Sequence, residues 1–286
     1  MLGEPGQCAE GHRDMRCPFV CTIPPPVVTA TSSSLRVDLN ADVGESFGAY
    51  SIGHDSGLMK VITSANIAAG FHAGDPSVLR QTIRLAKESG VAIGAHPGFP
   101  DLAGFGRRDM QVSARDAEDL VLYQLAAVAG VASAEGLHLQ HVKPHGALFN
   151  MAARDGVLAS AIARAVAAFD RRLILFGPPN SELVRAGEAA GLRVAAEGFA
   201  DRAYEPDGSL VSRTKPGAVI TEADEVVKRA VKIARDHSVV AVNGATVPLT
   251  VETLCVHSDT EGADVLASRL RAGLEAAGIR VIAVSR

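Results

Sequence analysis

Short runs of apolar and β-branched residues alternate with longer stretches of helical period from Leu35 to the end of the chain. This order is typical of α/β folds, in which each strand of a parallel sheet is followed by a helix that covers it. Several runs are apolar almost throughout, as expected for strands with both faces buried. We predict strands over Leu35–Leu39, Ser64–Ala68, Val91–Ala95, Leu137–Val142, Arg172–Phe176, Leu192–Ala196, Thr253–Val256 and Arg280–Val284.

Helical stretches separate these strands, and their ends carry the expected signals. Asp75 before Pro76 predicts an N-cap ahead of a first-turn proline, and Gly90 follows the same helical run. One interruption, Val239–Val242 and Thr246–Leu249 joined by Asn-Gly, predicts a β-hairpin. The predicted helices are Pro76–Ser89, Ala114–Glu135, Gly156–Phe169, Glu222–Asp236 and Glu261–Ala277.

Seven or eight β/α units can close into a barrel or form an open doubly wound sheet, and periodicity does not distinguish the two. The polar residues favour a barrel, because ionisable or amide side chains follow nearly every predicted strand. A ring of such groups forms at the C-terminal face of a β/α barrel, whereas an open sheet concentrates its site at one crevice. We therefore predict an irregular, single-domain α/β barrel of seven or eight strands over residues 35–286.

Net charge, apolar runs and cysteine count indicate which kinds of partner and which cellular compartment to expect. The formal net charge of -4 gives no broad attraction for nucleic acid or an anionic membrane surface, so neither is predicted as a partner. No uninterrupted apolar run reaches the ~18 to 20 residues of a membrane-spanning helix. Four cysteines do not make a disulfide scaffold in a chain this long, which favours the cytoplasm.

Residues 1–34 differ from the rest of the chain. They contain Gly, Pro, Ser and scattered charges and lack the continuous apolar segment of a signal peptide, so we predict either a disordered tail or a start codon assigned too early. Cys8, Cys17 and Cys21 lie there with His12, but their spacing lacks the two close ligand pairs of a zinc site.

Two segments place polar side chains at the ends of the first two strands. Asp38 and Asn40 share one side of a period-2 strand, so both would point into a barrel, which is unfavourable unless they bind something. Asp42 follows in the same run. In the segment 64–75, His72 lies between glycines that allow tight turns near Asn66, whereas the N-cap position gives Asp75 a structural alternative.

Three later segments add further candidates. His96 directly follows a strand, in a loop that two prolines hold rigid. Lys143 and His145 lie two residues apart and project the same way if the backbone stays extended. Beside a cationic or desolvated neighbour, a lysine can lose its proton and serve as a base, or keep it and hold a carboxylate. The last candidates are Glu197, Arg202 and His257.

The segments together resemble the LamB/YcsF family, whose members are described as A subunits of 5-oxoprolinase. The family usually has Cys where this chain has Ala69 and Gly where it has Ser258, and neither change replaces a charged group. The Ala69 change argues either that a thiol is dispensable there or that activity is altered. The matching runs, in the family's order, are Asp38–Glu45, Ser64–Ala68, Gly70–Asp75, Gly94–Asp101, Val142–Asn150, Glu197–Arg202 and Cys255–His257.

The resemblance implies a β/α barrel related to glycoside hydrolases and polysaccharide deacetylases. It also implies ATP-dependent hydrolysis of the lactam of 5-oxo-L-proline to L-glutamate, carried out with partner subunits B and C. A five-membered lactam keeps its amide resonance, so phosphorylation of the carbonyl oxygen would make ring opening favourable. This chain has no P-loop sequence, so we expect ATP to be handled by side chains such as Lys143 and Arg202 or on the partner subunits.

For this reaction we expect two histidines to transfer protons, with a carboxylate orienting one of them or the water. A lysine and an arginine would hold the substrate carboxylate or a phosphoryl group. The predicted catalytic residues are Asp42, His72, Lys143, His145 and Glu197, and the predicted substrate-binding residues are Asp38, Asn40, Asn66, Asp75, His96, Arg202 and His257.

Two other functions remain open from the sequence. Asp42, His72, His96 and His257 form a candidate N/O ligand set for a divalent metal, which would suit a metal-dependent deacetylase or amidohydrolase. Alternatively, the chain is a non-catalytic subunit that binds a small acid and regulates its partners.

Overall fold

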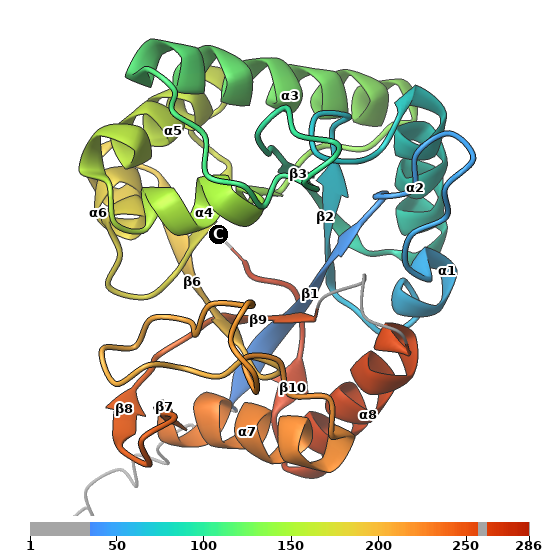
Figure 1. Cartoon of the computed structure of the whole chain (residues 1–286). Helices are drawn as coiled ribbons and strands as arrows, with labels where there is room; N and C mark the ends of the chain where they lie inside the picture. Colours follow the sequence, from blue (N-terminus) through green and yellow to red (C-terminus); the bar gives the residue numbers. More distant parts are fainter. Residues whose placement is uncertain (1–34, 257–261, 286) are drawn as a thin grey trace, which may run out of the picture. The chain divides into compact units, whose positions relative to one another are not determined.

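The computed structural model describes residues 35–256 and 262–285, and seven parallel strands form its centre (Figure 1). They are β1 (Arg36–Val43), β2 (Ser64–Ala68), β3 (Ala92–His96), β4 (His141–Val142), β5 (Ile174–Gly177), β6 (Arg193–Phe199) and β9 (Thr253–Val256). Each strand from β1 to β6 pairs with the next, and β9 pairs with both β6 and β1. The predicted α/β barrel is therefore confirmed, with seven strands in the closed ring.

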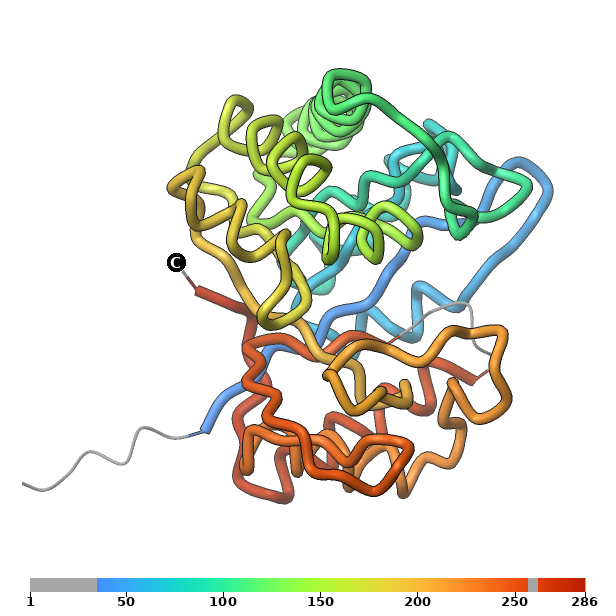
Figure 2. The backbone as a smooth tube through the Cα atoms, turned by 60° about the vertical axis from the view of Figure 1, so that its left-hand side comes forward, coloured from blue at the N-terminus to red at the C-terminus, as the bar shows by residue number. Residues whose placement is uncertain are grey.

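Four predicted strand boundaries are wrong. β6, predicted to end at Ala196, continues to Phe199. β1 continues past Leu39 to Val43, because its polar residues face the barrel interior and remain paired with β2. β4 is reduced to His141–Val142, although a longer strand was predicted. The last strand, β10 (Arg280–Val281), is also short and, among the described strands, pairs with the start of β1. In Figure 2 the red C-terminal segment passes beside the blue start of β1.

Helices form an outer layer around the strands (Figure 1). Asp75 caps the helix from Pro76, as predicted, by accepting hydrogen bonds from the backbone N–H groups of Ser77 and Val78. Three short helices were not among those predicted, and one of them, Gly146–Ala152, begins directly after the Lys-Pro-His run. The helices are α1 (Asp55–Leu58), α2 (Pro76–Ser89), α3 (Ala114–Ala134), α4 (Gly146–Ala152), α5 (Gly156–Phe169), α6 (Glu182–Ala189), α7 (Ala223–Asp236) and α8 (Ala263–Ala276).

The predicted hairpin is confirmed outside the barrel. β7 (Ser238–Val240) and β8 (Thr246–Pro248) pair antiparallel through a turn in which Gly244 takes a φ of +84°. Inside the barrel, an apolar cluster supports the polar centre described below. It consists of Ile174, Phe176, Ala195 and Val284.

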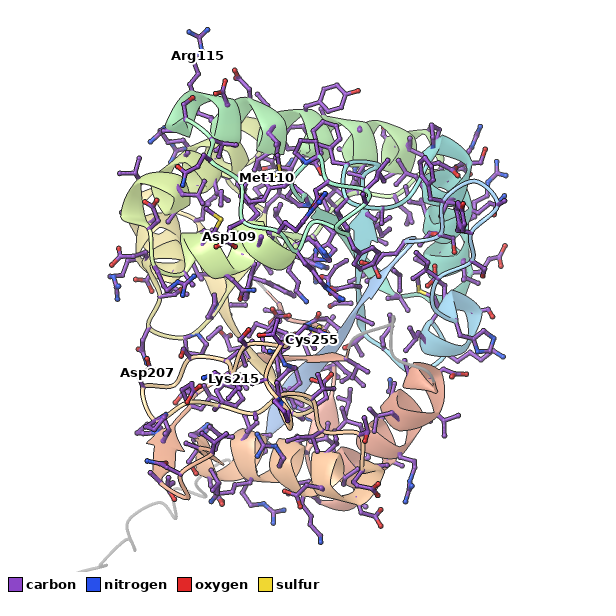
Figure 3. All side chains as sticks on the ribbon, viewed as in Figure 1. Asp109, Met110, Arg115, Asp207, Lys215 and Cys255 are labelled. Carbon is purple, nitrogen blue, oxygen red and sulfur yellow. The ribbon has the colours of Figure 1, made fainter. Side chains whose placement is uncertain are left out.

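Among the described helices, α3 has the length and mean hydropathy of a candidate membrane span. Its fully buried residues include Val121, Leu125 and Val128, and the helix packs against α5 in the outer layer. Arg115, near the start of α3, points away from the molecule in Figure 3. This pattern of one buried side and a charged first turn is that of a helix on a globular barrel.

Two glycines in the outer helices should respond in opposite ways to alanine. Gly130 lies within α3, and open space surrounds the position of its missing Cβ, so alanine should raise the free energy of unfolding by about 0.5–1 kcal/mol. Gly90 ends α2 at a φ of +68°, so alanine there should lower it by about 1 kcal/mol. Urea unfolding at unchanged slope measures both, and shifts of the same sign would contradict this prediction.

Candidate active site

The alternation of β1 carries three polar side chains into the barrel interior. Asp38, Asn40 and Asp42 are all buried, and the register sets Asn40 beside Ser64 and Asp42 beside Asn66 on β2. Neighbouring residues in register on parallel strands point to the same side of the sheet. The polar side chains of several strands therefore meet inside one barrel.

Among the three inward-facing polar residues of β1, Asp38 lies nearest the N-terminal end of the strand. Its carboxylate accepts hydrogen bonds from the hydroxyls of Thr63 at 2.6 Å, Ser64 at 2.7 Å and Thr253 at 2.5 Å. Burial raises the pKa of Asp38 to about 6, although the three hydroxyl donors act in the opposite direction. The group is therefore a carboxyl with an unusually high proton affinity in the folded state.

The side-chain amides of Asn40 and Asn66 connect Thr253, which donates to Asp38, with the carboxylates of Asp42 and Glu197. Asn40 Nδ2 donates to Thr253 Oγ1 at 2.6 Å and to Glu197 Oε1 at 2.9 Å. Asn66 Nδ2 donates to Asn40 Oδ1 at 2.7 Å and to Asp42 Oδ1 at 2.8 Å. Each amide thus uses both of its N–H donors, which fixes its orientation.

The ring of His141 lies between the side-chain amide of Asn66 and the apolar cluster. Its Nε2 lies 2.8 Å from Asn66 Oδ1, and its ring stacks on Phe176 of the apolar cluster with centroids 4.4 Å apart. Burial lowers the pKa of His141 to about 3, so the ring is neutral and its Nε2–H donates to the amide oxygen.

Lys143 is the cation of the centre. Its Nζ lies 2.9 Å from both Asp42 Oδ1 and Glu197 Oε1, and 3.0 Å from Cys255 Sγ. Cys255 is near the middle of the molecule in Figure 3. Burial alone would lower the pKa of Lys143, but the neighbouring acidic groups outweigh it and hold that pKa well above its usual value. The geometry therefore favours a lysine that keeps its proton over one that acts as a base.

Glu197 is held through one of its two carboxylate oxygens. Its Oε1 accepts from Lys143 and Asn40, whereas its buried Oε2 has no hydrogen-bond partner among the described residues. Burial raises the pKa of Glu197, while Lys143 partly offsets that effect. A carboxylate with a raised pKa and an oxygen open to a ligand is suited to proton transfer near neutral pH.

Three histidines lie beside this charged group. His96 Nε2 is 3.4 Å from Asp42 Oδ1 and 2.9 Å from His145 Nδ1, and the ring of His72 stacks on that of His145 with centroids 3.8 Å apart. Burial lowers the pKa of His72 and holds that of His145 well below its usual value, with positive charge on neighbouring histidines adding to the effect. Glu45 Oε1 lies 3.6 Å from His72 Nε2 and 3.8 Å from His145 Nδ1.

Most of the predicted site residues come together at this centre, but two do not join it. Asp75 caps α2 with one carboxylate oxygen and accepts from the Gly48 N–H with the other. Arg202 donates to the carbonyl oxygens of Val211 and Ala218. His257 lies outside the described residues. The residues brought together are Asp38, Asn40, Asp42, Asn66, His72, His96, Lys143, His145 and Glu197.

Other members of the centre were not predicted from the sequence. Glu45 ends the same polar run as Asp42, so its position was a usable signal. Thr253 and Cys255 alternate on β9 with the period of a strand, which could have indicated that both face inward. The remaining unpredicted members are Thr63, Ser64 and His141.

The contacts of Arg202 predict a local effect of its replacement. Arg202→Met should leave the carbonyl oxygen of Val211 without its buried donor and remove one of the two hydrogen bonds to the carbonyl oxygen of Ala218, which loosens the segment 203–219. Hydrogen exchange should accelerate at the amides of that segment, with little change in the barrel strands. Uniformly faster exchange throughout the chain would contradict this local role.

Sequence comparisons with known proteins identify the family to which this chain is similar. The model of the LamB/YcsF family matches residues 37–286. The chain is 54% identical over 250 residues to the 5-oxoprolinase A subunit of Bacillus subtilis (strain 168), covering 87% of this chain and 97% of that protein. It is 55% identical over 247 residues to the 5-oxoprolinase A subunit of Chloroflexus aggregans, covering 86% and 98%.

A solved structure extends the likeness to three dimensions. The lactam utilization protein of Thermus thermophilus superimposes with a TM-score of 0.83 at 46% identity, covering 87% of this chain and all of that one. The family model alone spans most of the chain, including every strand of the barrel except the first residue of β1. The chain therefore belongs to the LamB/YcsF family.

Proposed function

We propose that this chain is the A subunit of an ATP-dependent 5-oxoprolinase, which hydrolyses the lactam of 5-oxo-L-proline to L-glutamate. The observation that carries the proposal is the buried centre in which Lys143, Asp42 and Glu197 lie beside three histidines. Such a concentration of charge inside a barrel is unfavourable for stability, which indicates a site kept for chemistry. The names of relatives that are more than half identical supply the substrate class.

Ring opening needs an activated carbonyl, a water molecule as nucleophile and a proton for the departing nitrogen. In the proposed sequence, the γ-phosphoryl group of ATP passes to the carbonyl oxygen, and ADP leaves. Water then adds to the carbonyl carbon and loses a proton to a base, and the C–N bond breaks as the nitrogen receives a proton. The product of this step is an acyl phosphate, γ-glutamyl phosphate, and a second water molecule hydrolyses it to glutamate and inorganic phosphate.

The open oxygen of Glu197 gives this residue the role of base toward water. Its Oε2 is the buried carboxylate oxygen that Lys143 and Asn40 leave available, and burial raises the pKa of this carboxyl toward the working range. Lys143 holds Glu197 and Asp42 in place and supplies fixed positive charge where negative charge develops. His72 and His145 remain the proposed proton-transfer groups for the ring nitrogen.

We place ATP consumption in an assembly with subunits B and C. The sequence contains no P-loop, and the ammonium group of Lys143 is already paired with two carboxylates, so neither of these features provides a phosphate site. A cytoplasmic location fits a reaction that consumes ATP. This assignment favours an ATP site formed with, or on, the partner subunits.

The proposal is tested by co-expressing the chain with its genomic neighbours and measuring glutamate formed from 5-oxoproline. We expect activity only with ATP and all three subunits present. Ring opening that persists when this chain is omitted would instead identify it as a regulatory subunit. Full activity of the purified chain alone would overturn the shared mechanism, and the Gly130→Ala variant provides a control with an unchanged site.

A deacetylase or amidohydrolase remains the second candidate because of the histidines beside Asp42. Of the ligand set first predicted for it, Asp42, His72 and His96 lie together, with Asp42 Oδ1 accepting hydrogen bonds from Lys143 and Asn66. His257 lies outside the described residues. Release of acetate from N-acetylated substrates without ATP or partner subunits would favour this function over lactam hydrolysis.

A further inference from the structure

The lactam mechanism uses His72 and His145 for proton transfer in a metal-free site, but it does not explain why Glu45 and His96 are buried beside them. These four buried residues place one potential ligand atom each within 4.8 Å of one another. No other group of this kind occurs in residues 35–256 and 262–285. The positions of the ring protons decide what this cluster can bind.

Hydrogen bonds to backbone carbonyls fix the proton of His96 and that of His145. His96 Nδ1 lies 2.7 Å from the carbonyl oxygen of Lys143, and His145 Nε2 lies 2.8 Å from that of Phe105. A carbonyl oxygen only accepts, so the proton of each ring sits on the nitrogen that faces the carbonyl. In neutral rings, the other nitrogens carry lone pairs.

Those two lone-pair nitrogens face each other. His96 Nε2 and His145 Nδ1 are only 2.9 Å apart, and neither neutral ring has a proton left to place between them. Glu45 adds a carboxylate oxygen 3.8 Å from His145 Nδ1. Two lone pairs and a carboxylate converging in a buried space repel one another unless a cation lies between them.

His72 provides a second, independent observation. Both of its ring nitrogens are buried without a hydrogen-bond partner among the described residues, which is an unfavourable state for a polar group. Space for its ring exists because residue 98 is glycine, and a Cβ at that position would lie 2.5 Å from His72 Nδ1. The fold thus holds an imidazole beside the same group of acceptors, with a nitrogen available to a ligand.

We propose that Glu45, His72, His96 and His145 form a binding site for a divalent transition-metal ion of the Zn²⁺ type. Three imidazole nitrogens and one carboxylate oxygen suit Zn²⁺ and its neighbours better than Mg²⁺ or Ca²⁺, which prefer oxygen ligands. The carbonyls of Lys143 and Phe105 hold the rings of His96 and His145 by their far nitrogens, as outer partners of metal-binding histidines do.

Two of the donor separations lie close to the value expected for this ion, and the wider ones require the ligands to draw together. Metal–ligand bonds of about 2.0–2.1 Å in a tetrahedral site place the ligand atoms roughly 3.3 Å apart. The observed separations of 2.9 Å between His96 Nε2 and His145 Nδ1, and 3.6 Å between His72 Nε2 and Glu45 Oε1, lie on either side of that value. His72 and His145 are stacked nearly parallel, so one ring tilts when both bind the ion.

The test uses the full chain with its purification tag removed and with Cys8, Cys17 and Cys21 replaced by serine, which eliminates a competing thiol set. After chelator treatment and dialysis, Zn²⁺ is added, and bound metal is measured by elemental analysis and calorimetry. We expect one equivalent of Zn²⁺, a rise in Tm on binding, and the visible absorption of tetrahedral Co²⁺ when cobalt replaces zinc.

Two variants locate the ion. Glu45→Gln keeps the shape of the side chain, and we expect it and His96→Gln to weaken Zn²⁺ binding by more than about 100-fold, beyond the usual effect of losing an outer partner. The exposed His54→Gln, whose ring pairs with Asp264 at the surface, should bind like the parent protein. Far-ultraviolet circular dichroism checks that each variant remains folded.

Two results would contradict the proposed metal site. Absence of Zn²⁺ binding and of any Tm shift in the folded parent protein would overturn the proposal and leave a proton shared between His96 and His145 as the cation. Equal Zn²⁺ binding by the parent protein and the Glu45→Gln/His96→Gln double variant would place the metal elsewhere. Neither readout depends on lactam hydrolysis, so the metal site and the proposed function can fail separately.

Discussion

Replacement of Lys143 by methionine is expected to destabilise the fold by about 3–5 kcal/mol and to abolish activity in the assembled complex. The ammonium group lies 2.9 Å from a carboxylate oxygen of each of Asp42 and Glu197, and all three side chains are buried. Methionine fills the space of the lysine stem but leaves two carboxylates without their cation. Urea unfolding of the isolated chain gives the stability change, and glutamate formation gives the activity.

A double variant separates the charge effect from a packing effect. Adding Glu197→Gln to Lys143→Met removes one of the two unpaired charges and should recover a substantial part of the lost stability. Activity should not return, because the proposed base is also gone. If the double variant is less stable than Lys143→Met, the attraction between Lys143 and Glu197 is not what the single substitution disrupts.

The stability contributed by Asp38 is expected to fall as pH rises from about 4 to about 6. Burial raises the folded-state pKa of Asp38 to about 6 from its ordinary value of 3.8. In this window the folded chain holds a proton that the unfolded chain has released, so raising the pH favours unfolding. A shift of about two pKa units corresponds to roughly 3 kcal/mol over the window, because each unit is worth about 1.36 kcal/mol.

The measurement is the difference in unfolding free energy between the parent protein and Asp38→Asn across this pH range. We expect the parent protein to lose stability relative to Asp38→Asn as pH rises, and the difference to level off once the pH exceeds the folded-state pKa of about 6. Asp207→Asn provides a control, because hydrogen bonds from Ser209 lower the pKa of this exposed carboxyl from 3.8, so its contribution to stability changes only below about pH 4 and should stay nearly constant across this range. A pH-independent difference for Asp38→Asn would show that burial does not raise this pKa.

The alternation of strands and helices predicted an α/β fold, and the polar residues after the strands favoured a barrel over an open sheet. The period-2 pattern predicted that Asp38 and Asn40 face inward. Both residues are buried and hydrogen-bonded inside the closed ring. These predictions succeeded because they depend on local periodicity, which any short segment carries. The tight Asn-Gly hairpin and the Asp75 cap were predictable for the same reason.

Other features depend on which strands become neighbours, and a single sequence does not contain that information in local form. The pairing of Lys143 with Glu197 joins β6 to the residue that follows β4, so it requires the closed barrel. The convergence of Glu45 on the histidines likewise depends on loops from three strands. Arg202 looked like a substrate ligand because its bonds to backbone carbonyls are not visible in a sequence.

The most direct test of the proposed function is glutamate formation by the three-subunit complex carrying Glu197→Gln. Glutamine can keep the Oε1 contacts to Lys143 and Asn40 while removing the basic oxygen at Oε2. We predict that this complex assembles normally and loses at least about 100-fold in ATP-dependent ring opening. An assembled complex that forms glutamate at the parent rate would contradict a catalytic role for the buried centre of this chain.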